Sequence, residues 1–383
     1  MKPASHQKFS FSKILNSTGL LFLVLLWILP TVGLLVSSFR DKDQLALTGW
    51  WTALSTTERN EFRRTGISNE QYELDGNYVI SGKLLEPGGK LIQTFSTNFR
   101  DLTANSAGET AIFKDGSLFT LNKNGDYEWI SAVPFTHKRG KRIFYVAKVP
   151  PTFSLDNYRE VLTSEGVGQS FINTLKVTIP ATVIPIMIAS FAAYAFAWMQ
   201  FPGRQFLFIS VVGLLVVPLQ MSLIPLLSIY NDIGNYFGVS AKSYPGIWLA
   251  HTGFGLPLAI YLLRNYMGTL PREVIESAKI DGASHFQIFS RIVLPLSVPA
   301  LASFCIFQFL WVWNDLLVAL VFLGKKDEQI VLTSKLRELL GSRGDNWEIL
   351  TSSAFISIVV PLIVFFTLQR YFVRGLVTGS VKS

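Results

Sequence analysis

The stretch ESAKIDGASHFQIFSRIVLP, residues 276–295, decides how the rest of the sequence is interpreted. It lies between two long apolar runs, yet it is rich in small and charged residues and has a glycine near its middle. A segment that spans a bilayer needs about 20 mostly apolar residues, and this stretch is too polar for that. We therefore expect it to lie outside the membrane, where another molecule can recognise it.

Local signals predict a helix, a tight bend and a second helix here. Pro271 suits the first turn of the first helix, because a proline there loses no hydrogen bond. Gly282 can adopt a positive φ and end that helix. The segment Ser284–Gln287 has the S-x-x-Q pattern of a capping box, which starts the second helix. Pro295 is expected to end the second helix before the next apolar run.

Small side chains around the bend would let another protein surface approach closely. They are Ser277, Ala278, Gly282 and Ala283, and the second helix adds an apolar stripe of Phe286, Phe289, Ile292 and Val293. One interpretation is an amphipathic hairpin that rests on the membrane interface. Charge, the glycine bend and exposed aromatic side chains together favour the other interpretation, a socket for a soluble partner.

The composition is that of a membrane protein. Apolar residues make up 49% of the 383 residues and charged residues only 16%, against about 25% in soluble domains. Six segments are apolar and long enough to span, at about 19–39, 171–198, 206–229, 245–266, 296–322 and 351–372. The first is longer than the apolar core of a secretory signal, so a retained helix is favoured over a cleaved signal peptide.

These spans predict an all-α membrane protein with one large insertion. The expected parts are a cytoplasmic N-terminus (1–17), a first span (18–40), an insertion (41–168), a membrane domain (169–372) that contains the polar stretch 271–295, and a cytoplasmic tail (373–383). With the N-terminus inside, the cytoplasmic pieces carry eleven basic residues and the two short outer loops six. This excess places both termini and the polar stretch in the cytoplasm.

The insertion has a strand-like pattern. Alternation of apolar and polar residues in 110–131 is interrupted by hairpin turns at Lys114–Ser117 and Asn124–Asp126. Its 15 basic and 16 acidic residues nearly cancel, so the formal charge of +8 sits beside the spans and does not indicate nucleic-acid binding. The insertion is expected to be an extracytoplasmic β-rich domain, either a docking surface for a partner or a passive cover.

Motifs for covalent or metal chemistry are absent from the sequence. No phosphate-binding G-x-x-x-x-G-K-[ST] pattern occurs, and no serine-elbow pattern is present. The four histidines are scattered, and the single cysteine, Cys305, forms no C-x-x-C pair. We expect a protein that is not an enzyme, holds no cofactor or metal of its own, and takes any energy for transport from a partner or an ion gradient.

The polar stretch resembles the motif of permease subunits of bacterial ABC importers. The motif reads E-A-A, three residues, G, nine residues, I-x-L-P, and it falls here on Glu276, Ser277, Ala278, Gly282, Ile292, Leu294 and Pro295. Ser277 departs from the usual alanine but is equally small. The resemblance implies that this stretch is a coupling helix held by an ATPase subunit, with Asp281 and Ala283 also in the contact.

Further stretches resemble the carbohydrate, maltose-importer type of these permeases. They are NYREVL (157–162), SFINTLKVTIPATV (170–183), FAAYAFAWMQFPGR (191–204), WNDLL (313–317) and the tail LQRYFVRGLVTGSVKS (368–383). The resemblance covers spans two to six and both ends. The long insertion after the first span is similar to that of alpha-glucoside importer permeases.

The resemblance implies a type I ABC importer permease in the bacterial inner membrane. Its implied partners are two ATPase subunits that bind ATP and Mg, a second homologous permease subunit, an extracytoplasmic solute-binding protein and the lipid bilayer. The tail, with Gly375, Gly379 and Lys382, would reach the ATPase subunits, although an unheld tail would simply fray. Import of an oligosaccharide, an alpha-glucoside in particular, is the implied function.

Two other features invite functional or structural interpretations. Asn314 and Asp315 are polar groups within the fifth span, which could line the transport path or serve as hydrogen-bonded packing groups. Trp311 and Trp313 could stack on a sugar or pack between helices. The outer loop 324–349 contains Gly341, Ser342, Arg343 and Gly344, which the resemblance assigns to contact with the binding protein.

Three other functions are alternatives to sugar import. An ABC permease for another small solute would carry the same motif. A membrane-anchored sensor would need a cytoplasmic signalling module, yet the longest expected cytoplasmic segment has about thirty residues. An ion-coupled transporter would favour more intramembrane ionisable groups and internal repeats than the sequence offers.

Overall fold

The computed structural model describes residues 11–86, 88–163, 166–324, 326–342 and 346–380. The chain divides into two compact units, Met1–Ser154 and Leu155–Ser383. The division falls earlier than position 168, where the sequence pattern had suggested the end of the insertion. The reason is helix α3 (Asp156–Thr163), which packs against helices of the second unit through the fully buried Val161.

The first unit begins with a long apolar helix and two short ones. These are α1 (Phe11–Ser38), α2 (Lys42–Leu47) and the 3₁₀ turn η1 (Trp50–Thr52). The segment that leads into the β-rich region is hydrogen-bonded to the segment that follows it. The Ser154 amide donates to the Phe39 carbonyl at 2.9 Å, and the Gln44 side-chain amide donates to the Pro150 carbonyl at 2.9 Å. The two ends of the insertion are therefore held together by hydrogen bonds.

The β-rich prediction is confirmed, since the described residues of the insertion form nine strands in two antiparallel sheets. The strands are β1 (Thr57–Arg64), β2 (Tyr72–Leu74), β3 (Asn77–Lys83), β4 (Leu91–Ser96), β5 (Asn105–Ser106), β6 (Thr110–Ile112), β7 (Leu118–Leu121), β8 (Asp126–Ser131) and β9 (Arg142–Val149), with a 3₁₀ turn η2 (Ser68–Glu70). One sheet has the order β1-β9-β4-β5 and the other β2-β3-β8-β7-β6. Both sheets contribute to one aromatic core that includes Phe95, Phe119 and Tyr145.

The two hairpin turns predicted in the insertion are both present. Strands β6 and β7 pair around Gly116, and β7 and β8 pair around Gly125; both glycines have positive φ, at 78° and 90°. Such a φ is readily adopted only by glycine, which explains why these turns are visible in the sequence.

A buried tyrosine and a glutamate meet at the edge of the first sheet. The Tyr145 hydroxyl donates to Glu61 at 3.2 Å, and Glu61 also accepts from Lys90 at 2.7 Å. Burial, assisted by the negative charge of Glu61, raises the pKa of Tyr145 to about 12. Burial opposes ionisation of Glu61, but Lys90, Tyr145 and Arg59 together outweigh it and lower the pKa of that carboxyl.

These shifts predict how the β-rich region responds to alkaline pH. An unfolded tyrosine ionises near pH 10. Because the folded pKa of Tyr145 is about 12, its contribution to stability is complete below pH 10 and is lost as the pH rises to 12. We expect Tyr145→Phe to weaken the alkaline loss of stability in the purified chain, followed by tyrosinate absorbance and thermal melting. Tyr72→Phe, at an exposed strand position, is the control and should not change it.

The second unit is helical. After α3 it contains α4 (Val167–Trp198), α5 (Arg204–Gly213), η3 (Leu214–Val216), α6 (Leu219–Phe237), α7 (Tyr244–Met267), α8 (Arg272–Ile280), α9 (His285–Ile288), the π-helical η4 (Phe289–Val293), α10 (Leu294–Leu296), α11 (Val298–Trp313), α12 (Leu317–Phe322), α13 (Leu332–Ser342) and α14 (Trp347–Ser380). Helix α4 packs against α7 and α11, and α11 packs against α14.

Four helices in the described residues are long and apolar enough to cross a membrane, namely α1, α4, α7 and α14. The number of candidate spans reaches six if each of two bent pairs of helices forms one span. The third predicted span is bent by 108° between η3 and α6, where Pro218 cannot donate a backbone hydrogen bond. The fifth predicted span, 296–322, is interrupted between α11 and α12 rather than continuous.

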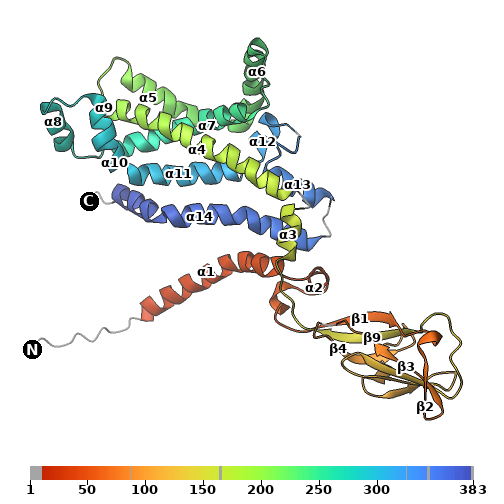
Figure 1. Ribbon diagram of the computed structural model, residues 1–383. Helices are drawn as coiled ribbons and strands as arrows, with labels where there is room; N and C mark the ends of the chain where they lie inside the picture. Colours follow the sequence, from red (N-terminus) through yellow and green to blue (C-terminus); the bar gives the residue numbers. More distant parts are fainter. Residues whose placement is uncertain (1–10, 87, 164–165, 325, 343–345, 381–383) are drawn as a thin grey trace, which may run out of the picture. The chain divides into compact units, whose positions relative to one another are not determined.

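The helical unit has two distinct ends. Figure 1 shows α8, α9 and α10 at one end, together with the C-terminal end of α14. Helices α3, α12 and α13 lie at the opposite end. The unit therefore separates the polar stretch from the point where the insertion joins it.

Candidate functional site

The polar stretch forms the helix–bend–helix that its sequence predicts. Helix α8 ends at Ile280 with Asp281 as its C-cap, and Gly282 follows with a φ of +81°. Ser284 caps α9 through the predicted capping box, since its hydroxyl accepts from the Gln287 amide and the Gln287 side chain accepts from the Ser284 amide. Pro271 is the N-cap of α8, one position before the first turn.

The stretch presents a mixed polar and apolar surface. Glu276, Ser277, Asp281 and Gly282 are exposed, and Ala278 and Ala283 are half-buried. Apolar side chains lie among them, with Ile280 86% exposed and Phe286 67% exposed. Phe286 was expected in the same stripe as Phe289, but Phe289 is buried against α4 and Phe286 is not. A surface of this kind is suited to contact with another protein.

The buried face fixes the stretch to the helical unit. Ile275, Ile288, Phe289 and Val293 belong to one buried cluster with residues of α4, α7 and α11. The Tyr194 hydroxyl lies 3.0 Å from His285 Nδ1, which joins α4 to the start of α9. These contacts were not found from the sequence, because they depend on which helices pack together. The bend is therefore attached by packing to helices α4, α7 and α11.

Pro295 does not end the second helix, which corrects the expectation from the sequence. The π-helical turn η4 changes the hydrogen-bond register just before α10, so a proline in the first turn of α10 breaks no required bond. The bend of 71° follows at Ser297, where the chain turns into α11. Ile292 and Leu294 are half-buried, and Pro295 is exposed.

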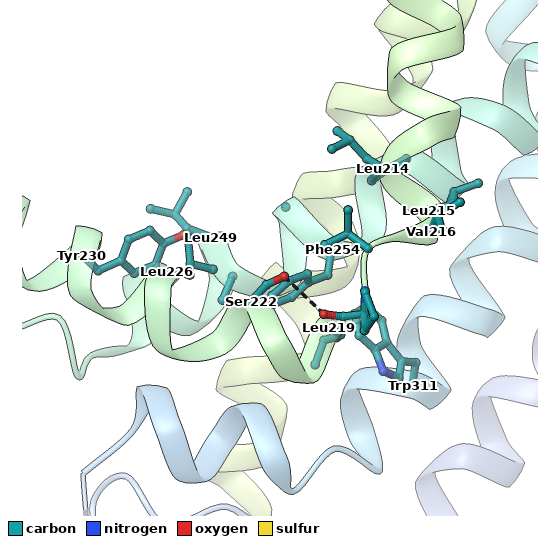
Figure 2. A pocket seen from close by; sticks show the side chains of 15 residues that line it. Leu214, Leu215, Val216, Leu219, Ser222, Leu226, Tyr230, Leu249, Phe254 and Trp311 are labelled. Atoms are coloured by element: carbon teal, nitrogen blue, oxygen red, sulfur yellow. Dashed lines mark hydrogen bonds between the residues drawn. The ribbon is translucent and has the colours of Figure 1, made fainter.

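A cavity of about 580 Å³ opens beside the bend of the third span. Figure 2 shows that it is lined by Leu214, Leu219, Tyr230, Phe254 and Trp311, among other mostly apolar side chains. Ser222 also lines it, and its hydroxyl donates to the Pro218 carbonyl at 3.3 Å. Aromatic side chains with a few polar groups are common in sites for small organic molecules.

The two tryptophans considered for sugar stacking, Trp311 and Trp313, have different environments in the structure. Trp313 is buried, stacks on Phe309 and donates to the Ser357 carbonyl at 2.8 Å, so it packs between helices. Trp311 lines the cavity.

Asn314 and Asp315 lie at the break in the fifth span. The Asn314 amide donates to the Leu310 carbonyl at 2.8 Å and ends α11. Asp315 accepts from the Ala319 amide at 3.2 Å in the first turn of α12, and it lies 3.8 Å from His251 Nε2. Neither residue lines the 580 Å³ cavity; Asp315 lines a much smaller one with His251. His251 was not singled out from the sequence, since an isolated histidine carries no motif.

The predicted outer loop is partly helical and is tied to the spans. Helix α13 contains Gly341 and ends at Ser342, whereas Arg343 and Gly344 lie outside the described residues. The Asn173 side chain donates to the Asp327 and Ile330 carbonyls, at 2.9 and 3.0 Å. A second cavity, of about 360 Å³, is lined by residues of this segment, including Gly341.

The tail continues the last helix, since α14 runs to Ser380 and includes Gly375 and Gly379. Lys382 lies outside the described residues.

Comparisons with known proteins identify the family of the chain. Residues 178–378 match the family model described as "Binding-protein-dependent transport system inner membrane component". The chain is 64% identical, over 95% of its length and 96% of the relative's, to the alpha-glucoside transport system permease protein AglG of Rhizobium meliloti (strain 1021).

Other relatives match less of the chain. The osmoprotective compounds uptake permease protein GgtD of Synechocystis sp. is 62% identical over 60% of this chain and 76% of its own length. The trehalose transport system permease protein SugB of Mycobacterium tuberculosis is 33% identical over 61% of this chain and 84% of its own length. The chain therefore belongs to the family of inner membrane components of binding-protein-dependent transport systems.

Proposed function

We propose that this chain is a permease subunit of an ATP-driven importer for an oligosaccharide, and that the oligosaccharide is an alpha-glucoside. The observation that carries the proposal is the 64% identity to a permease of an alpha-glucoside transport system over 95% of the chain. A match over 95% of the chain must include the β-rich insertion. The match to the permease for osmoprotective compounds covers only 60% of the chain.

One of two ATPase subunits would hold the stretch Glu276–Pro295, and the two together would supply ATP and Mg. This part of the proposal is supported by the exposed Glu276, Ile280 and Phe286, and by the buried face that joins them to the spans. The C-terminal end of α14, with Gly375 and Gly379, lies at the same end of the unit (Figure 1). Closing of the ATPase subunits would tilt the helices and alternate access to the path.

The solute would pass between this subunit and a second homologous permease subunit. The 580 Å³ cavity with Trp311 and Tyr230 supports a path that includes the bend of the third span. A solute-binding protein would deliver the sugar at the other end of the unit, where Gly341 borders the second cavity.

The uptake of labelled solutes tests the proposed substrate class. A strain that lacks this chain should fail to accumulate alpha-glucosides and recover on complementation, while its uptake of unrelated amino acids should stay unchanged. Accumulation of osmoprotective compounds in place of alpha-glucosides would overturn the substrate assignment but leave importer function intact.

We further propose that both termini and the polar stretch are cytoplasmic and that the insertion is extracytoplasmic. The insertion joins the helical unit at α3, at the opposite end from α8, which supports this topology (Figure 1). In a Cys305→Ser background, Asn124→Cys places a thiol at the exposed β7–β8 turn. We expect a membrane-impermeant thiol reagent to label it in spheroplasts. Labelling only after lysis would reverse the topology.

A further inference from the structure

We infer that the segment 42–54, between α1 and strand β1, is a membrane anchor that seats the inserted domain in the lipid interface. Three large apolar side chains in it are exposed: Leu47 by 59%, Trp51 by 75% and Leu54 by 84%. Polar contacts hold the backbone of the segment in place, because Arg40 donates to the carbonyls of Thr48 and Gly49 at 3.0 Å each. The segment is thus fixed by backbone hydrogen bonds while its apolar side chains stay exposed.

A contact with α1 sets the depth of this segment. A Cβ atom at Gly33 would come within 2.7 Å of the indole nitrogen of Trp50, so the ring lies directly against the glycine. The apolar span that contains Gly33 ends at Ser38. Gly33 is therefore about 7.5 Å along the helix from that end, at 1.5 Å per residue. The end of a span marks the edge of the hydrocarbon region, so Trp50 lies within about two helical turns of that edge.

The depth identifies the occupant of the apolar face as lipid. The segment contacts α1 through Trp50, and the apolar side chains of α1 are themselves largely exposed in this unit, Trp27 by 78%. The anchor thus lies beside the apolar surface of a helix long enough to span a bilayer. Tryptophan is favoured at the boundary between hydrocarbon and headgroups. Arg59 contacts Asp43 and lies 3.8 Å from Asp41, so these three charges are paired within the unit, and the attachment we infer rests on apolar contact.

Depth-dependent quenching in the assembled importer tests this inference. In the Cys305→Ser background, Leu54→Cys would carry a bimane label in phosphatidylcholine liposomes that contain nitroxide lipids. We expect a nitroxide near the headgroup to reduce the emission more than one near the chain end, and aqueous iodide to reduce it little. Phe62→Cys is the matched control, because Phe62 is an exposed phenylalanine (55%) further along β1. Its label should respond to iodide and not to nitroxide lipids.

Each other outcome would overturn the inference. Equal iodide quenching at both sites would place the segment in water. A label at position 54 that neither quencher reaches would show that protein covers the face. If Leu54→Cys fails to assemble, Trp51→Cys gives the same comparison. None of these outcomes depends on which solute is carried, so the proposed substrate can fail without affecting the test.

A pair of glycine variants tests the role of Trp50. Gly33→Val should displace the indole and lower the quenching of the position 54 label by headgroup nitroxides. Gly19→Val adds the same side chain to the same helix where nothing lies within 4 Å, and it should leave the quenching unchanged. Equal quenching in both variants would contradict the contact with α1 as the feature that sets the depth.

Discussion

Replacing Gly282 with arginine is expected to reduce sugar uptake by at least about tenfold while the protein still inserts in the membrane, a change that corresponds to about 1.4 kcal/mol. Gly282 has a φ of +81°, and a side chain in that conformation costs roughly 1–2 kcal/mol of backbone strain. No atom lies within 4 Å of the position of a Cβ, so the side chain itself would project from the exposed bend. There it would meet the proposed ATPase surface.

Two further variants separate strain from docking. Gly282→Ala adds the strain without the bulk, so it should lose less uptake than Gly282→Arg. Gly238→Arg adds comparable strain, at a φ of +69° with nothing within 4 Å, but it lies at the end of α6. Co-purification with the ATPase subunits should fall in Gly282→Arg and stay normal in Gly238→Arg. Equal retention of the ATPase in both would remove the support for a socket at the bend.

The parts of the site that were predictable from sequence are those that local chemistry determines. Gly282 ends α8, and Ser284 with Gln287 starts α9, because both features involve only residues a few positions apart. The hairpin turns at Gly116 and Gly125 were predictable for the same reason. Each of these features is recorded in residue type and spacing alone.

The parts that were not predictable depend on long-range packing. Strands β3 and β4 follow each other in sequence but belong to different sheets, and no alternation pattern reports that choice. Ile275 and Phe286 are both apolar, yet one is buried and the other exposed, because burial depends on where α4 and α7 lie. The π-turn that accommodates Pro295 likewise has no recognisable local pattern. The sequence could place the coupling stretch but not its buried attachments.

The break at Asp315 gives the second large prediction. Asp315→Leu is expected to destabilise the helical unit by about 1–2 kcal/mol, because it removes the helix-capping bond from the Ala319 amide. The change also removes the carboxylate that lies 3.8 Å from His251 Nε2, beside a buried ring whose nitrogens have no hydrogen bond within the described residues. Denaturant unfolding of the purified importer in detergent would measure the difference.

Variants at the neighbouring position and a double variant test whether the contact with His251 contributes to the stability lost in Asp315→Leu. Asn314→Leu is the matched control, because Asn314 is exposed and bonds only to the Leu310 carbonyl of its own helix, so its loss should cost less than about 1 kcal/mol. Asp315→Asn keeps an oxygen for the Ala319 amide and should be milder than Asp315→Leu. If the two side chains act together, Asp315→Leu combined with His251→Phe should cost less than the sum of the single changes. Strictly additive losses would mean that Asp315 stabilises the break only by capping α12, and that the 3.8 Å approach to His251 contributes nothing.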